Sequence, residues 1–144
     1  MGRHEVRVAA VGVSRPVSPA LARRAVGVVL DGERAARASV HIVFLSSQRM
    51  RVLNRRTFGR DRSTDVIAFT LRHDDRLVGD IYVCPAAVRR GAAHHGRPVR
   101  EEFVRVMIHG TLHLLGHDHP ESHRTRSRMW RLQEQYVTAV GGVP

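Results

Sequence analysis

The sequence predicts a single α+β domain, residues 1–144, in which helices cover a small mixed β-sheet. Three observations support this fold class. Segments with the alternating pattern of strands are interleaved with segments that repeat at the helical period. Two strand-like segments follow each other closely enough to form a hairpin, which a purely parallel sheet would not contain. The length of 144 residues is enough for one hydrophobic core but short for two domains.

The first half of the chain predicts two strands and two helices. Residues 5–13 alternate between apolar and polar side chains, which indicates a strand. Residues 18–33 predict a helix, because they begin with a serine N-cap followed by a proline at the first helical position. The β-branched and apolar residues 38–46 predict a second strand. Residues 47–58 predict a short helix with serine at its start.

The second half predicts a hairpin followed by helices. Residues 64–71 and 76–84 read as two strands that the turn RHDD joins. A helix is expected after Pro85 and ends by Gly96. A last helix is expected from residue 120 to residue 140, because a proline begins it and a glycine pair follows it.

Between these two helices, residues 98–115 predict the best-defined helix of the chain. Pro98 begins it, and Glu101 and Glu102 complement the positive end of the helix dipole. An apolar stripe at helical spacing predicts the face that packs against the sheet. The stripe consists of Phe103, Val104, Met107, Ile108, Thr111, Leu112 and Leu115.

The charge of the chain favours an anionic partner. The formal net charge is +11, and all 24 basic residues are arginine. Guanidinium groups suit phosphate oxygens, so nucleic acid is the first expectation, although a basic surface that only keeps the protein solvated is an alternative. No apolar run approaches the ~20 residues that span a bilayer, so we expect no membrane partner. Cys84 is the only cysteine, which excludes an internal disulfide and favours a cytoplasmic protein.

The stretch HGTLHLLGHDH, which begins at His109, contains three histidines whose spacing suits one metal ion. His109 and His113 are four residues apart in the expected helix, so their side chains lie on one face about one turn apart. Gly116 tolerates the positive φ of a helix end, so the chain can turn there and bring His119 back as a third ligand. His117 is an alternative third ligand.

Imidazole ligands favour zinc among the common metal ions, so we expect one Zn²⁺ at this site. Three protein ligands leave one position for water, which is typical of a catalytic zinc. A structural zinc usually has a fourth ligand, often cysteine, and Cys84 is alone. Asp80 and Asp118 are candidates for a hydrogen-bond partner that fixes the tautomer of an imidazole. Any one of the histidines could instead border the core, but this explains the combined spacing poorly.

The same histidine spacing occurs in metzincin proteases, where a glutamate after the first histidine acts as the base. Here that residue is Gly110, which has no side chain to transfer a proton. A metal ion can still polarise a phosphoryl oxygen or lower the pKa of a water molecule. With a net charge of +11, this chemistry fits a phosphodiester better than a peptide bond.

Three blocks of the sequence together resemble the YbeY family of bacterial endoribonucleases that mature ribosomal RNA. They are LNRRTFGRDRSTDVIAF at 53–69, GDIYVC at 79–84 and HGTLHLLGHDH at 109–119. Their order and spacing agree with the family throughout, whereas the N-terminal part fits its layout without a sharp motif. His117 stands where the family usually has tyrosine.

The resemblance implies a zinc-dependent, single-strand-specific endoribonuclease that acts in 16S rRNA 3′-end maturation and in ribosome quality control. It implies that His109, His113 and His119 bind one zinc ion, with a metal-binding helix packed against a mixed sheet. It further implies single-stranded RNA such as the 16S rRNA precursor, rather than DNA, as the substrate. The implied partners are the small ribosomal subunit and its assembly GTPase. Two other functions stay open, an RNA-binding ribosome-assembly factor with a structural metal and a metalloprotease.

The chain departs from the family at one functional position. The arginine that serves the active site in the family aligns with Phe58 here. Arg60, two residues further along the same basic loop, is therefore the candidate catalytic residue that holds the scissile phosphate. Arg56 and Arg62 are alternatives, and a solvated loop without a catalytic role also fits the charge pattern.

Overall fold

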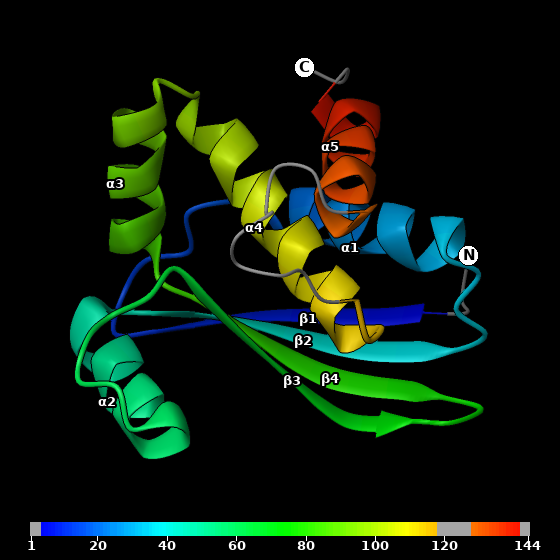
Figure 1. Ribbon diagram of the computed structural model, residues 1–144, viewed down its shortest axis with the longest axis horizontal. Coiled ribbons are helices and arrows are strands. Elements are labelled where there is room, and N and C mark those ends of the chain that lie inside the picture. Colours follow the sequence, from blue (N-terminus) through cyan, green and yellow to red (C-terminus); the bar gives the residue numbers. More distant parts are fainter. Residues whose placement is uncertain (1–3, 118–127, 142–144) are drawn as a thin grey trace.

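A four-stranded mixed β-sheet forms the base of the fold (Figure 1). The computed structural model describes residues 4–117 and 128–141. The strands are β1 (His4–Val11), β2 (Ala38–Leu45), β3 (Val66–His73) and β4 (Leu77–Val83). Their order across the sheet is β1-β2-β4-β3, in which β1, β2 and β4 are parallel and β3 is antiparallel to β4. The predicted α+β fold with a mixed sheet is confirmed.

Helices cover one face of this sheet, and one helix covers part of the other face (Figure 1). The helices are α1 (Pro19–Gly32), α2 (Ser47–Phe58), α3 (Pro85–His95), α4 (Val99–Leu114) and α5 (Arg128–Gly141). The four helices α1, α3, α4 and α5 lie on the same side, whereas α2 lies on the opposite side at one end of the strands. Within the described ranges, none of the helices has the length and apolar character needed to cross a bilayer.

The observed elements follow the sequence pattern, with small shifts at their ends. The predicted hairpin is formed by β3 and β4, which residues 74–76 connect. β1 ends at Val11 instead of residue 13, because Gly12 has a φ of +76° and cannot continue an extended strand. The predicted start of the last helix at residue 120 lies outside the described residues.

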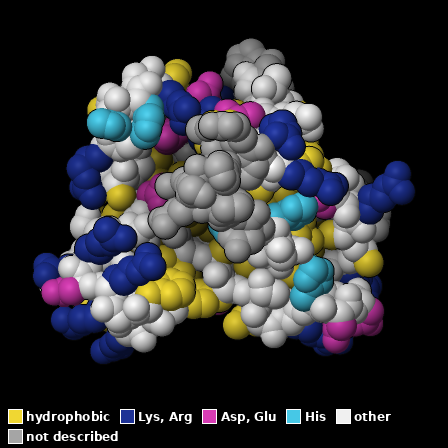
Figure 2. Space-filling model, viewed as in Figure 1, with side chains coloured by type: hydrophobic (Ala, Val, Ile, Leu, Met, Phe, Trp, Pro, Cys, Tyr) yellow, Lys and Arg dark blue, Asp and Glu magenta, His cyan; other side chains and the backbone are white. Residues whose placement is uncertain are grey.

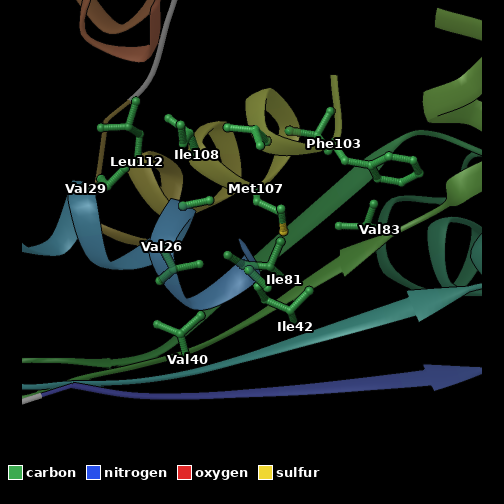
Figure 3. Packing of buried hydrophobic residues seen from close by; sticks show 14 of the residues in the cluster. Val26, Val29, Val40, Ile42, Ile81, Val83, Phe103, Met107, Ile108 and Leu112 are labelled. Atoms are coloured by element: carbon green, nitrogen blue, oxygen red, sulfur yellow. The ribbon is translucent and has the colours of Figure 1, made fainter. Parts of the chain in front are cut away.

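The main hydrophobic core lies between the sheet and the helices above it (Figure 3). Alternate residues of β2 and β4 point into this core, and side chains of α1 and α4 cover them. The labelled members are Val26, Val29, Val40, Ile42, Ile81, Val83, Phe103, Met107, Ile108 and Leu112. Residues 102–108 of α4 are all buried, although two of them are charged. Packing on several sides therefore fixes the position of α4, the helix that carries His109 and His113.

A smaller apolar cluster lies on the opposite face of the sheet, under α2. Val43, Leu45 and Ile67 of the strands pack there with Met50 of α2. Cys84 belongs to this cluster and is fully buried as a free thiol. The cluster attaches α2, and with it the basic loop that follows α2, to the end of the sheet.

Two glycines allow α4 to lie unusually close to β4. A Cβ atom on Gly79 of β4 would lie 2.6 Å from Cδ2 of Leu114. A Cβ atom on Gly110 of α4 would lie 2.8 Å from Cγ2 of Ile81. Real Cβ atoms essentially never approach other heavy atoms this closely, so a larger residue at either position would force the facing side chain or the helix itself to shift.

We expect Gly79→Ala and Gly110→Ala each to lower the free energy of unfolding by about 1–3 kcal/mol, because the added methyl group overpacks the α4–β4 contact. Urea unfolding followed by circular dichroism measures this change. Gly27→Ala is the matched control, since a Cβ atom on Gly27 of α1 would meet nothing within 4 Å. That control should be neutral or stabilise the protein by up to about 1 kcal/mol, and equal losses in all three variants would contradict the close-approach explanation.

Candidate active site

His109 and His113 lie on one face of α4 with their ring nitrogens directed toward each other. The two Nε2 atoms are 3.0 Å apart, and the ring centroids are 4.5 Å apart. Two imidazole nitrogens this close can share one metal ion or one proton. His119, the predicted third ligand, lies outside the described residues, as does Asp118. Among the residues that the structure does describe, no cluster of three metal-binding side chains is formed.

The chain turns sharply after α4, as the sequence predicts for Gly116. Gly116 has a φ of +95°, and its N–H donates to the carbonyl of His113 at 3.0 Å. The N–H of His117 donates to the carbonyl of Leu112 at 3.0 Å, which completes a Schellman cap. The turn therefore redirects the chain immediately after the second histidine of the pair.

His117, the alternative third ligand, contacts a carboxylate on α1. Its Nε2 atom lies 2.8 Å from Oε1 of Glu33, and the hydroxyl of Tyr136 donates to Oε2 of the same carboxylate. Burial alone would raise the pKa of Glu33, but the hydrogen bonds from Tyr136 and His117 outweigh burial and lower this pKa. The contact gives His117 a partner other than the histidine pair.

A cavity of about 340 Å³ opens beside the histidine pair. His109, Gly110 and His113 of α4 line one side of the cavity. The other side is lined by Asn54, Phe58, Arg60, Arg62, Thr64, Val66, Ile67 and Ala68. The structure thus brings Arg60 and Arg62 to the same cavity as the two histidines, whereas Arg56 is not among the lining residues.

The basic loop between α2 and β3 is held in place at two points. The Asn54 side chain, which is buried in α2, donates to the carbonyl of Arg62 at 2.9 Å. Arg51 makes two hydrogen bonds, of 2.9 and 3.0 Å, to the carboxylate of Asp61. These hydrogen bonds and the positive charge of Arg51 lower the pKa of Asp61, which favours its charged form. The loop therefore has a defined position from which Arg60 can reach into the cavity.

Basic side chains gather over α2 and the loop after it on the face that Figure 2 shows. Phe58 is the last residue of α2 and is 55% exposed. Gly59 follows it in the left-handed conformation, with a φ of +69°, and turns the chain toward the cavity. Phe58, which the resemblance aligns with an arginine of the family, is thus an exposed aromatic ring at the cavity rim, with Arg60 just beyond the turn.

Gln133 of α5 contacts the histidine pair and was not among the residues that the sequence singled out. Its Oε1 atom lies 2.6 Å from Nδ1 of His109, and the side chain is only 2% exposed. A signal was present, because Gln133 occupies the buried stripe of α5 together with Met129, Val137 and Val140. A polar residue inside an apolar stripe needs a hydrogen-bond partner in the core.

The prediction that Asp80 could orient an imidazole is wrong. Gly79 and Ile81 face α4, so the side chain of Asp80 between them points to the opposite face of the sheet. There the hydroxyl of Tyr82 donates to the Asp80 carboxylate at 3.4 Å.

A buried ion-pair network lies next to this site, between α4 and α5. Arg105 donates two hydrogen bonds of 2.9 Å to the carboxylate of Glu134 and one of 2.6 Å to Glu102. Burial would raise the pKa of Glu134, but hydrogen bonds from Arg105 and Gln133 outweigh it and lower this pKa below its ordinary value of 4.5. The hydrogen bonds to the two carboxylates outweigh burial and raise the pKa of Arg105. The network joins the two helices at a fixed register.

The fold and the cavity together define a class of protein. Imidazole groups can bind a metal ion or transfer a proton, and guanidinium groups bind phosphate oxygens. An α+β domain that brings both groups to one cavity, on a chain of charge +11, suits a nuclease that hydrolyses phosphodiester bonds.

Comparisons with known proteins agree with this class. The family model described as Endoribonuclease YbeY matches residues 12–141. Proteins named Endoribonuclease YbeY from Thermotoga maritima and Neisseria meningitidis are 37% and 36% identical over 103 and 116 residues. These matches cover 72% and 75% of this chain and 68% of each relative. The solution structure of a Thermotoga maritima protein superposes with a TM-score of 0.68 at 29% identity, covering 95% of this chain and 89% of that one.

The chain belongs to the YbeY endoribonuclease family. The predicted resemblance is therefore confirmed over most of the chain, including part of the N-terminal region that carries no sharp motif. The family assignment supports an RNA-cleaving hydrolase and is consistent with ribosomal RNA processing.

The lowered pKa of Glu134 predicts how acid affects stability. Because the folded-state pKa lies below 4.5, the carboxylate stabilises the fold above that pH and loses this contribution as the pH falls through the folded-state pKa. We expect Glu134→Gln to lower the free energy of unfolding at pH 7 by about 1–3 kcal/mol and to flatten its decline below pH 4.5. Urea titrations from pH 3 to pH 7 measure both effects.

Glu101→Gln is the control for the Glu134 variant, since Glu101 contacts the same guanidinium group from a more exposed position, at 3.3 Å. This change should cost less than about 1 kcal/mol. If the Glu101 variant lost as much free energy of unfolding as the Glu134 variant, with the same pH dependence, the acid sensitivity would not come from the Arg105–Glu134 pair between α4 and α5.

Proposed function

We propose that this chain is a zinc-dependent, single-strand-specific endoribonuclease that acts in 16S rRNA 3′-end maturation and in ribosome quality control. The observation that carries the proposal is the shared cavity of His109, His113, Arg60 and Arg62. Membership of the YbeY family supports the activity. The substrate would be single-stranded RNA such as the 16S rRNA precursor in the cytoplasm. The small ribosomal subunit and its assembly GTPase would be the partners, as the family resemblance implies.

The histidine pair fits a zinc ion in its donor chemistry. His109 and His113 would bind the ion through Nε2, and His119 would be the third ligand. The fit rests on the convergence of the two Nε2 atoms, 3.0 Å apart, because tetrahedral zinc brings its nitrogen ligands to a similar separation. When bound, the ion would supply Lewis-acid polarisation of a phosphoryl oxygen or lower the pKa of a water molecule.

The arginines supply charge stabilisation in the proposed mechanism. Arg60 and Arg62 would bind non-bridging oxygens of the scissile phosphate and hold the phosphodiester beside the histidine pair. Negative charge that develops at phosphorus in the transition state would then be neutralised by groups already in position. Either water or the 2′-hydroxyl of the RNA could attack, and a 2′,3′-cyclic phosphate end on the product would identify the internal attack.

The environment of Gly110 supports cleavage of RNA over proteolysis. The base of a metzincin protease would have to occupy this position, but a Cβ atom there would lie 2.8 Å from Ile81. Residue 110 therefore packs closely against β4, and a glutamate there would force the Ile81 side chain or the helix to shift. The same cavity remains open to a phosphodiester, which needs no carboxylate at this point.

We expect His113→Ala to lower the rate of cleavage of single-stranded 16S rRNA fragments by 100-fold or more, because even loss of a hydrogen-bond partner of a metal ligand costs about 10–100-fold. A chelator should abolish the wild-type activity, and added zinc should restore it. The measurement is cleavage by purified protein on labelled RNA, together with zinc content by elemental analysis.

The His113→Ala protein also controls for contaminating nuclease, which basic proteins retain. Residual cleavage equal to wild type would reject the proposed site. Salt-sensitive RNA binding without metal-dependent cleavage would favour the assembly factor with a structural metal. Chelator-sensitive cleavage of casein would favour a protease.

Arg60→Ala tests the arginine assignment. We expect kcat/KM on single-stranded RNA to fall on the order of 10-fold or more, because a preorganised cation at the phosphate is lost. Arg62→Ala tests the alternative in the same assay. Arg23→Ala is the matched control, since Arg23 is exposed on α1 away from the cavity and should change the rate little. Unchanged cleavage by Arg60→Ala would remove this residue from the mechanism.

A further inference from the structure

One face of α4 carries three polar side chains at intervals of four residues, and α5 covers the first two. These residues are Arg105, His109 and His113, of which Arg105 is buried and the histidines are partly buried. Gln133 and Glu134, which are consecutive on α5, contact His109 and Arg105 respectively. A third hydrogen bond, between the side chains of Gln133 and Glu134, joins these two contacts into a continuous chain from the guanidinium group to the imidazole.

The direction of each hydrogen bond in this chain follows from the chemistry of its members. The guanidinium group of Arg105 only donates, so the carboxylate of Glu134 accepts both bonds at 2.9 Å. Since that carboxylate only accepts, the atom of Gln133 that lies 3.0 Å from Oε2 of Glu134 must be the amide nitrogen. The amide orientation of Gln133, which atomic positions alone leave open, is thereby determined.

The orientation of Gln133 in turn determines the proton on His109. With its nitrogen directed at Glu134, Gln133 presents the amide oxygen to Nδ1 of His109 at 2.6 Å. An amide oxygen only accepts, so Nδ1 must carry the hydrogen. In a neutral imidazole Nε2 then holds the lone pair, and Nε2 is the atom that faces His113.

We infer that Gln133 is a positioning residue that holds His109 in the Nδ1–H tautomer, so that its Nε2 lone pair points at the metal position. The part of this inference that concerns a metal rests on the proposed function, whereas the tautomer does not. Gln133 is 2% exposed, so water does not compete strongly for Nδ1. The Arg105–Glu134 pair acts one step further away, because it prevents the amide from rotating.

The tautomer can be measured directly in the metal-free protein by long-range ¹H–¹⁵N correlation spectra of the histidine side chains above pH 7.5. We expect wild-type His109 to show a protonated Nδ1 and an unprotonated Nε2. Gln133→Leu should give a mixture of the two tautomers. It should also raise the dissociation constant for zinc, measured by competition with a chelating dye, by about 10–100-fold. An Nε2–H tautomer in wild type would overturn the inference without any variant.

Two further variants separate positioning from a general effect on folding. Gln133→Glu retains an acceptor for Nδ1, so the wild-type tautomer should persist even where stability falls. Gln135→Leu changes the same residue type at an exposed position of α5 and should leave tautomer and zinc affinity unchanged. Retention of the wild-type tautomer and zinc affinity by Gln133→Leu would overturn the inference. A wild-type protein with the Nδ1–H tautomer that binds no zinc would refute the proposed function and leave the role of Gln133 intact.

Discussion

The close contact between α4 and β4 is the constraint on which the cavity depends. Gly79 and Gly110 remove the two Cβ atoms that would otherwise hold the helix off the strand, at 2.6 Å from Leu114 and 2.8 Å from Ile81. Both glycines belong to blocks by which the sequence resembles its family, GDIYVC and HGTLHLLGHDH. Their physical role is to let α4 lie close to β4, and His109 and His113 of this helix line the cavity together with residues of β3.

The cavity has two sides that reach it from different parts of the sequence. The imidazole side comes from α4 and is braced by α5 through Gln133. The guanidinium side comes from the loop after α2, which Asn54 and the Arg51–Asp61 pair hold. The imidazole side depends on a contact between residues that are distant in the chain. The guanidinium side depends on contacts between α2 and the loop that follows it. The chemistry of the site therefore follows from the tertiary structure rather than from either motif alone.

The sequence predicted the helices and strands better than the side-chain contacts between them. Strand alternation and helix caps located the hairpin and α4, and the i, i+4 spacing correctly placed His109 and His113 on one face. Gln133 was not predicted, because its partner comes from another helix and its only local signal is a polar residue in an apolar stripe. The sequence contained the information to exclude Asp80, because successive residues of a strand point to opposite faces of the sheet and its neighbours Gly79 and Ile81 pack against α4.

The burial of α4 has a consequence for the motions of the protein. Residues 102–108 are enclosed by packing, and the last turn is tied to the sheet where the hydroxyl of Thr70 donates to the carbonyl of Leu114 at 3.0 Å. Elements with such contacts exchange their amide hydrogens only through openings that approach global unfolding, whereas exposed loops open locally at little cost. The backbone that carries the imidazoles should therefore open rarely, whereas the loop that carries Arg60 and Arg62, held by one hydrogen bond to Asn54 and by the exposed Arg51–Asp61 pair, should open more readily.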